Sequence, residues 1–445
     1  MSDTKVEKFN ELYTRGLSLL EQGKDEDAMG ILYQAACVAP EGWLALAVQL
    51  IRDGQGQLAI ERLKEVLRIS PDAKVRAAAL NNIGMVLANR GQNAEALEAF
   101  EQAAELFPDI PDTWSNLGLM RKWSGEYPAA LRYIDRAIRL DPWHEQANFI
   151  RSMTTLLAGD YPAGFELYEC RWRSKANGLQ KIASPTLEWD GTNGTRLLVY
   201  GEQGHGDAIL ALRYAREIRK LGLWQAWVCQ KSMAPVLHSV PEIDQVIEVG
   251  ELLPDFNCHL PAVSLPRIFK TAIDTIPSPG GYIMLPPDPV LYGPGYHVGI
   301  VWRGSKAQGN DLFRSTNLDQ WAPVLSMPGV TFHSLQVDNA DEALLYPSIV
   351  SGTPPADWGE TIRMVAGLDL VISVDTSVVH LCGAMGVPCW CALHCRPYFV
   401  FPPKCGDSTP WYSSVRLYRQ DREFEWNNVM ERIANDLRGI VEKNI

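Results

Sequence analysis

The chain has 445 residues and carries a formal net charge of −12. This length exceeds one ordinary domain and predicts two or three. The acidic balance argues against non-specific binding of nucleic acid, which relies on Lys and Arg to neutralise phosphates.

The chain shows no sign of export or membrane insertion. No apolar run is long enough to span a bilayer, and the polar start "MSDTKVEKFN" lacks the apolar core of a secretory signal. The nine cysteines are an odd number scattered along the chain, which fits reduced thiols better than a disulfide framework. We therefore expect a cytoplasmic protein without a transmembrane segment.

The first 175 residues repeat with a period of 34. The stretch "GQNAEALEAFEQAAELFP" aligns with "GEYPAALRYIDRAIRLDP", and a further unit opens with "GDYPAGFELYECRW". Small residues and prolines recur at this step, as in the pairs Gly84/Gly118, Gly91/Gly125, Ala96/Ala130, Ala103/Ala137 and Pro108/Pro142. Degenerate copies upstream are marked by Ala28, Ala59, Pro40 and Pro71. The pattern resembles the tetratricopeptide repeat (TPR), in which small residues let two helices cross, and predicts an α-solenoid of roughly five units.

Two interpretations of this solenoid remain open. Stacked repeats present a concave face, which favours binding of a protein or peptide partner. A solenoid that only dimerises, or only packs on the next domain, has the same sequence pattern.

After Trp189 the pattern changes to alternating strands and helices. Buried strands are predicted at "RLLVY" (196–200), "WQAWVCQ" and "IDQVIEV", with a helix from the first of these to about Gly222. A second series has strands at "YHVGIVWRG", "VTFHSLQV", "LDLVISV" and "VPCWCAL", with helices at "LDQWAPVLSM", "DWGETIRMVAGL" and "TSVVHLCGAMG". This alternation is typical of parallel sheets.

The domain organisation follows from these patterns. We expect an α + α/β multidomain chain with helical repeats over 1–175 and a first Rossmann-like domain over 190–275. A Pro/Gly-rich linker over 276–295 leads to a second Rossmann-like domain over 296–445. In such sheets ligands bind outside the carboxyl ends of the strands.

The glycine-rich loop "GEQGHGD" (201–207) follows the first predicted strand. Its spacing is neither that of the dinucleotide fingerprint nor that of a Walker loop. Asp207 stands at the start of the next helix, where a carboxylate caps free N–H groups. The same position at a strand's carboxyl end suits a general base in a cleft, so both roles stay open, with Gly204, His205 and Gly206 beside it.

A second loop, "DLVISVDTSVVHLCGAMGVP" (369–388), begins a helix at Asp375, Thr376 and Ser377. Free N–H groups and hydroxyls at a helix N-terminus bind anions, and His380 shares a helix face with Thr376 and Ser377. The group predicts a diphosphate site. Capping, with His380 packed on the sheet, is the alternative.

A third loop, "VWRGSKAQGNDLFRSTNL" (301–318), carries Arg303, Lys306 and Arg314 beyond a strand end. Cations at this place would neutralise a leaving phosphate. Basic residues in a loop are also common where they are simply solvated.

The ordered set "GEQGHGD", "VGIVWRG…ND..RS", "F.SLQ", "DLVISVDTSVVHLCGAMGVPCW" and "TPWYSSVRLYRQ" is similar to the heptosyltransferase-like glycosyltransferases, family nine, in a version fused to TPR repeats. The phrase "GDYPAGFELYECRWR" resembles the same fused group. The resemblance implies a GT-B fold, which is a pair of Rossmann-like domains, and a metal-independent, inverting transfer from a nucleotide sugar.

The resemblance also implies roles for single residues. Asp207 matches the catalytic base, Asp375, Thr376, Ser377 and His380 match the donor-phosphate loop, and Gln336 falls in the matching "F.SLQ". The chain departs from the pattern at two positions, where His205 replaces an apolar residue and Gly309 replaces a Lys.

The patch "CWCALHC" (389–395) invites a zinc interpretation, but its spacing fits no common finger. Alternating cysteines in an apolar strand are typical of buried thiols. We expect no metal and no cofactor.

These observations predict a glycosyltransferase that moves a sugar from a nucleotide sugar to an acceptor hydroxyl, on a protein, peptide or glycan that the repeats recruit. The alternative is a non-catalytic TPR scaffold whose degenerate second half binds a nucleotide sugar without turning it over. The sugar, the nucleotide, the acceptor and the oligomeric state are left open.

Overall fold

The computed structural model describes residues 3–22, 24–174, 178–277, 280–305, 311–338, 340–350 and 354–444. Lys306 and Gly309 lie outside these residues. The chain divides into two compact units, Met1–Thr154 and Thr155–Ile445, and each is described by itself.

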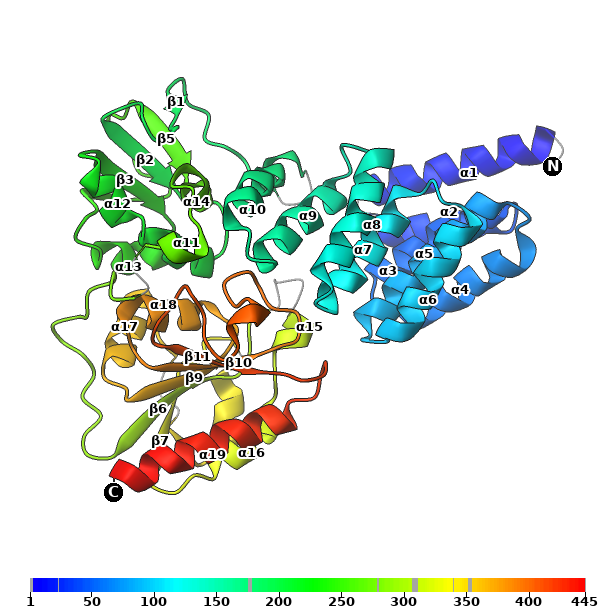
Figure 1. The fold of residues 1–445 in the computed structure, drawn as a ribbon. Coiled ribbons are helices and arrows are strands. Elements are labelled where there is room, and N and C mark those ends of the chain that lie inside the picture. The colour runs from blue at the N-terminus through cyan, green and yellow to red at the C-terminus, as the bar shows by residue number, and fades with distance from the viewer. Residues whose placement is uncertain are drawn as a thin grey trace. The chain divides into compact units, whose positions relative to one another are not determined.

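The first unit is built from α-helices that pack as consecutive pairs (Figure 1). The helices are α1 (Asp3–Glu21), α2 (Asp25–Ala36), α3 (Pro40–Arg52), α4 (Gly56–Ile69), α5 (Ala73–Asn89), α6 (Asn93–Leu106), α7 (Pro111–Trp123) and α8 (Tyr127–Leu140). The next helix, α9 (Glu145–Leu157), begins in this unit and ends in the second.

The repeat positions identified in the sequence have the environments that the pattern requires. Ala96, Ala103, Ala130 and Ala137 are fully buried at helix contacts. The turns between α5 and α6 and between α7 and α8 contain Gly91 and Gly125, with φ of 74° and 76°, a left-handed conformation that other residues rarely adopt. The predicted helical solenoid is therefore confirmed.

Helices α7 and α8 are in close contact at Gly118. A Cβ added to Gly118 would lie 2.5 Å from Ile134 Cγ1 and 3.2 Å from the carbonyl oxygen of Ala130. We expect Gly118→Leu to lower the free energy of unfolding of this unit by about 1–3 kcal/mol, because the added atoms overpack a filled contact.

Thermal unfolding followed by circular dichroism would measure this loss. Gly30→Ala in α2 is the matched control, because nothing lies within 4 Å of the added Cβ and Ala favours a helix by about 1 kcal/mol over Gly. Equal melting temperatures for Gly118→Leu and the wild type would contradict the proposed close contact.

The second unit contains two parallel sheets. The first has the order β1-β5-β2-β3-β4, and every pairing in it is parallel. Its strands are β1 (Leu187–Glu188), β2 (Arg196–Tyr200), β3 (Trp224–Cys229), β4 (Gln245–Glu248) and β5 (Cys258–Pro261). Its helices are α11 (His205–Leu212), α12 (Ala215–Lys220), α13 (Ala234–His238) and α14 (Leu265–Ile268), with the 3-10 turns η2 (Lys231–Met233), η3 (Ala262–Ser264) and η4 (Ile273–Thr275). We call residues 187–277 the first α/β half.

The second sheet has the order β11-β10-β9-β6-β7-β8 and is also parallel throughout. Its strands are β6 (Tyr296–Val301), β7 (Val330–Ser334), β8 (Ile349–Val350), β9 (Leu370–Val374), β10 (Cys389–Leu393) and β11 (Val415–Arg419). Its helices are α15 (Asp311–Arg314), α16 (Ala322–Leu325), α17 (Trp358–Ala366), α18 (Ser377–Met385) and α19 (Asn427–Asn444), with η5 (Leu318–Trp321), η6 (Ala340–Leu345) and η7 (Pro403–Cys405). We call residues 280–444 the second α/β half.

The central strands of the second sheet read as continuous apolar runs because both of their faces are covered. Every residue of β9 and of β10 is buried, and Trp302, Trp321 and Phe332 lie in the core beside them. The structure therefore confirms the predicted parallel-strand region.

The boundary of the first unit differs from the predicted end of the repeats at residue 175. The compact unit ends at Thr154, and the stretch that opens the last repeat-like segment forms α10 (Tyr161–Tyr168) and η1 (Glu169–Arg173) within the second unit. We call these two elements, residues 161–173, the junction segment. Their side chains pack on both α/β halves, as described below.

Candidate functional site

Strand order places the functional loops. In the second sheet β6, β7 and β8 run outward to one side while β9, β10 and β11 run to the other, so the winding direction switches between β6 and β9. In the first sheet the same switch lies between β2 and β5. Parallel α/β sheets bind ligands at the carboxyl ends of strands at such a switch. The loops after β2, β6 and β9 occupy these positions.

The two α/β halves meet at these loops. Helix α11, which follows β2, packs against α18, which follows β9. A Cβ on Gly206 would lie 3.0 Å from His380 Cδ2, so a larger residue here would require the His380 ring to shift by a few tenths of an ångström. Farther along, the buried Arg213 donates to the carbonyl oxygen of Trp411 at 3.0 Å and joins the halves a second time.

Asp207 lies in the first turn of α11 and faces the second half, while Gly204 is the residue that precedes the helix. The backbone N–H of Gly204 acts on the carboxylate and lowers its pKa. Oδ1 also accepts a hydrogen bond from the hydroxyl of Tyr398 at 3.2 Å. Burial, together with the charge of Asp375, raises the pKa of Asp207 to about 6. A carboxyl poised near neutrality at a strand end has the property that a general base needs.

His380 is held between the halves. Its Nδ1 lies 2.9 Å from the hydroxyl of Tyr412, and its opposite edge faces Gly206. Burial lowers the pKa of His380 to about 4, so the imidazole is neutral at pH 7. His380 follows Ser377 by three residues on α18, and it is only 6% exposed.

The start of α18 holds the other predicted phosphate ligands. Thr376 precedes the helix, and its hydroxyl lies 3.0 Å from Ser373 Oγ. Ser377 is the first helical residue. Asp375 is buried, with Oδ2 at 3.7 Å from His394 Nε2. Burial pushes the pKa of Asp375 upward, but His394 and nearby positive charges outweigh it and hold the pKa below its ordinary value.

The predicted cations of the third loop have different surroundings. Arg314 is 12% exposed at its side chain and donates to the carbonyl oxygen of Asp375 at 3.0 Å, so it lies beside the start of α18. Arg303 pairs with Glu342 at 3.2 Å. Both arginines therefore pair with a carboxylate, Arg314 with Asp311 at 3.4 Å and Arg303 with Glu342, and of the two it is Arg314 that lies next to the diphosphate candidates.

The side chain of Gln336 forms hydrogen bonds with backbone groups. Its Oε1 accepts the N–H groups of Trp302 and Arg303 at 3.2 and 3.0 Å, and its Nε2 donates to the carbonyl oxygen of Arg303. The side chain therefore braces the loop after β6.

His205 makes contacts that an apolar residue could not. Its Nε2 lies 3.2 Å from Gln230 Oε1, and its Nδ1 accepts the indole N–H of Trp358 at 3.2 Å. Because Gln230 follows β3 and Trp358 begins α17, the His205 side chain links the two halves.

Arg171, Glu202 and Tyr398 also belong to the candidate site, although the sequence patterns did not single them out. Arg171 of the junction segment is 1% exposed and pairs with Glu169 at 2.7 Å and with Glu202 at 3.0 Å. It also donates to Ser264 Oγ at 2.7 Å. Tyr398 holds Asp207, as described above. Arg171 thus ties the junction segment to the glycine-rich loop.

Glu202 is the second unusual carboxyl of that loop. It is 2% exposed at its side chain, and burial raises its pKa to about 7. One oxygen accepts from Arg171 and from the N–H of Val263, while Oε2 has no hydrogen-bond partner among the described residues. Its place in "GEQGHGD" was visible in the sequence, but its buried partner, 31 residues earlier, was not.

The junction segment also packs on the second half. The hydroxyl of Tyr161 donates to the carbonyl oxygen of Phe399 at 3.2 Å and accepts from Trp411 Nε1 at 3.1 Å. Tyr168 is hydrogen-bonded to Gln203 in the glycine-rich loop at 3.1 Å. The segment therefore buttresses the loop that carries Asp207 from outside the two sheets.

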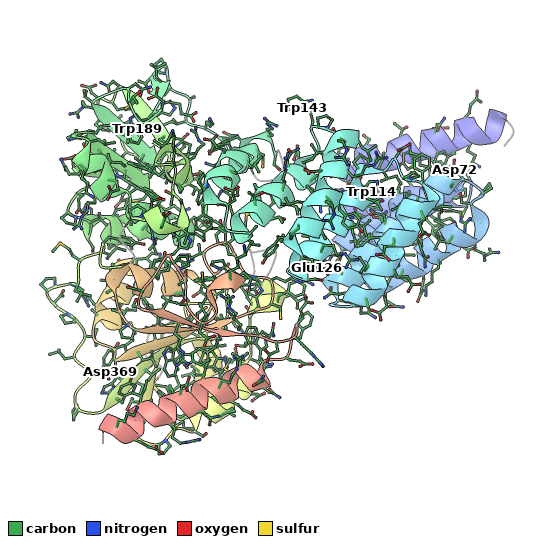
Figure 2. All side chains as sticks on the ribbon, viewed as in Figure 1. Asp72, Trp114, Glu126, Trp143, Trp189 and Asp369 are labelled. Atoms are coloured by element: carbon green, nitrogen blue, oxygen red, sulfur yellow. The ribbon has the colours of Figure 1, made fainter. Side chains whose placement is uncertain are left out.

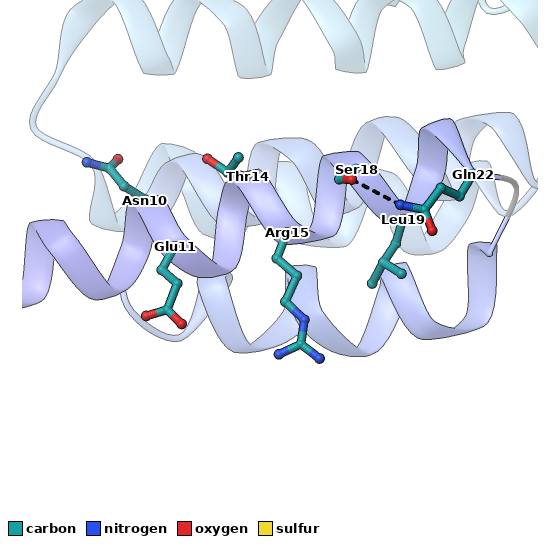
Figure 3. Close-up of a pocket in the computed structure, with 7 residues that line it drawn as sticks. All are labelled: Asn10, Glu11, Thr14, Arg15, Ser18, Leu19 and Gln22. Atoms are coloured by element: carbon teal, nitrogen blue, oxygen red, sulfur yellow. Dashed lines mark hydrogen bonds between the residues drawn. The ribbon is translucent and has the colours of Figure 1, made fainter.

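Other candidate sites have weaker support. Within the part of the chain that the structure describes, no cluster of three or more His, Cys, Asp or Glu could hold a metal ion, and Cys389 and Cys391 are buried strand residues. A hollow of about 720 Å³ beside α1 is lined by residues of that helix alone (Figure 3), which are Asn10, Glu11, Thr14, Arg15, Ser18, Leu19 and Gln22. Over the described residues, the helices are too short or too polar to cross a membrane.

Comparison with known proteins identifies the repeats. Residues 39–109 match the family model of the tetratricopeptide repeat. Protein FlbA of Caulobacter vibrioides is 26% identical over 447 residues, which cover 89% of this chain and 72% of FlbA. The photosystem I assembly protein Ycf3 of Rippkaea orientalis is 30% identical over 104 residues, which cover 20% of this chain and 60% of Ycf3.

Among solved structures, MamA 41-end from Desulfovibrio magneticus RS-1 is 20% identical with a TM-score of 0.31, over 38% of this chain and 96% of that one. PilF of Pseudomonas aeruginosa is 20% identical with a TM-score of 0.35, over 49% of this chain and 89% of that one. The match of residues 39–109 shows that the chain carries tetratricopeptide repeats.

Proposed function

We propose that the protein is a TPR scaffold that binds a partner protein through its repeats and a nucleotide sugar at the facing strand ends of its second unit. One observation carries the second part. The loops at the switch points of two parallel sheets meet, with Asp207 on one side and Arg314, Thr376 and Ser377 on the other.

The chemistry of the second half suits a diphosphate. Helix α18 has nine residues and begins with two hydroxyl side chains, and the N–H groups of its first turn favour an anion. Arg314 brings a guanidinium to the same place, and arginine pairs with phosphate through two parallel hydrogen bonds. The GT-B resemblance of the sequence supports a nucleotide sugar as the source of that diphosphate.

Calorimetry with UDP, GDP, CDP and ADP and their sugar conjugates would test this part. We expect one nucleotide family to bind, and Arg314→Gln to weaken that binding about tenfold or more, a loss of at least about 1.4 kcal/mol. Arg363→Gln is the matched control, because Arg363 is 48% exposed on α17 and pairs only with Asp288 in the described structure. If none of these ligands saturates the wild-type protein at millimolar concentration, the proposal fails.

A second candidate function is sugar transfer, and the raised pKa of Asp207 favours it. In this reaction Asp207 takes the proton of an acceptor hydroxyl as its oxygen attacks the anomeric carbon. The bond from that carbon to the diphosphate breaks, and Arg314 and the start of α18 accept the charge of the leaving group.

A further inference from the structure

A basic hollow lies on the last complete helix pair of the first unit. It has a volume of about 480 Å³ and is formed by α7 and α8. Figure 2 labels Trp114, in the first turn of α7, and Glu126, directly before α8. The charged and aromatic residues that line the hollow are Trp114, Tyr133, Arg121, Arg132, Arg136 and Arg139, with Glu126 at one end.

Three of these arginines share one face of α8. Arg132, Arg136 and Arg139 are spaced by four and three residues, which places their side chains in a row. Arg132 and Arg139 are exposed, and among the described residues neither has an ion-pair partner. Within the described part of the chain Arg136 forms an ion pair only with the exposed Asp109, at 3.6 Å, a contact that contributes little. The row therefore has unused positive charge on a chain whose net charge is −12.

The floor of the hollow is aromatic. The rings of Trp114 and Tyr133 stack with centroids 6.0 Å apart, and the Arg136 guanidinium lies 5.9 Å from the Trp114 ring. The indole N–H of Trp114 donates to the carbonyl oxygen of Pro108 at 2.7 Å, which fixes the ring. Rigid aromatic rings beside arginines are the composition found at energetically important positions of protein interfaces.

The spacing matches an extended acidic chain. Arg132 and Arg136 are separated by a rise of about 6 Å along the helix, and alternate residues of an extended strand stand about 6.6 Å apart on one face. Two carboxylates at alternate positions would therefore meet Arg132 and Arg136, while Arg139 follows at a rise of only about 4.5 Å and adds positive charge at the end of the row. An apolar residue next in the series would reach the aromatic floor.

We propose that the α7–α8 hollow docks an extended acidic segment of a partner protein, with carboxylates at alternate positions and a neighbouring apolar side chain on Trp114 and Tyr133. This inference rests on the proposed partner-binding role and names its surface and chemistry. Nucleic acid is the less favoured occupant. It would extend beyond the hollow, where the net charge of −12 of the chain repels its phosphates.

Fluorescence anisotropy with the full chain tests the proposal. The probes are two labelled 12-residue peptides, each with Glu at alternate positions and one Phe, placed before the Glu series in one and after it in the other. We expect saturable binding of at least one, and a loss of tenfold or more in Arg132→Glu/Arg139→Glu. Lys8→Glu/Lys64→Glu makes the same charge change at exposed positions of the same unit and should bind as the wild type does.

Each other outcome overturns the proposal. Absence of saturable binding rejects the hollow as an acidic-segment site, and an equal loss in both double variants reduces it to general charge attraction. Equal binding of the peptides with Lys in place of Glu removes the charge argument. Binding of a labelled 12-nucleotide oligo-U that only the α8 variant loses would reassign the hollow to nucleic acid, and self-association lost only in that variant would reassign it to a second copy. Nucleotide binding measured on the same variants separates failure of this surface from failure of the proposed function.

Discussion

Arg171→Met is expected to lower the free energy of unfolding of the second unit by about 3–5 kcal/mol. The guanidinium is 1% exposed and holds Glu169 and Glu202. Removing one member of a buried ion pair leaves the other charge without compensation, which costs far more than the pair itself contributes. Glu202 is 2% exposed and its pKa is about 7 even beside Arg171. Without Arg171 it must either stay charged out of contact with water or take up a proton, and both cost stability. Guanidinium denaturation with hydrogen exchange of the β2 amides would measure the loss.

Two further variants test whether the loss comes from the buried ion pair. Arg171→Met/Glu202→Gln removes both buried charges of one pair and should recover a large part of the stability, a non-additivity that a double-mutant cycle detects. Arg422→Met removes an arginine that is 80% exposed and 3.9 Å from Glu425, and it should change stability by less than about 1 kcal/mol. A loss in Arg171→Met no larger than that in Arg422→Met would show that the network does not hold the junction segment to the loop.

Asp207→Asn is expected to reduce sugar transfer by about a hundredfold or more while donor binding persists. An amide cannot take the proton of the acceptor hydroxyl, so the variant lacks the general base. Donor binding should persist because the proposed phosphate contacts lie on the second α/β half. Asparagine still caps a helix as well as aspartate does, so it can accept the Gly204 N–H. Initial rates with the nucleotide sugar that binds in calorimetry would measure the effect, and the exposed Asp274→Asn serves as the control. Near-normal turnover in Asp207→Asn would leave only the capping role.

The pH dependence of Asp207 has a definite sign. Its pKa in the folded protein is about 6, above the ordinary value of about 3.9, so the folded state binds more protons than the unfolded chain between these values. The stability that Asp207 contributes is therefore full below about pH 3.9 and is lost as the pH rises through about 6. At pH 8 the Asp207→Asn variant should be at least as stable as the wild type, with a gain of up to about 3 kcal/mol. The transfer rate of the wild type should instead rise with pH through the same range.

The sequence by itself determined the elements whose signals are local. The 34-residue period located Gly91, Gly125 and the buried alanines of the solenoid, because each repeat carries its own packing pattern. The apolar runs of β2, β6, β9 and β10 predicted the strands of the sheet cores, since strands covered on both faces need apolar residues throughout.

The weakest strand signals belong to β1, β5, β8 and β11. Strand β5, "CHLP", has four residues that include a His and a Pro, yet all four are buried between β1 and β2. Only its neighbours in the sheet make it a strand. The predicted helix to Gly222 divides into α11 and α12 where the buried Arg213 reaches the second half, which is a tertiary contact without a local pattern.

The tertiary structure alone decided how the loops work together. The sequence placed Asp207 at a strand end, but Tyr398, which holds it, lies 191 residues away, and Asp375, which helps to raise its pKa, comes from the other sheet. Arg171 looked like part of a repeat, and only folding buries it against Glu202. Burial and charge pairing depend on which groups become neighbours in space, and a single sequence records the residue types of those groups but not their distances.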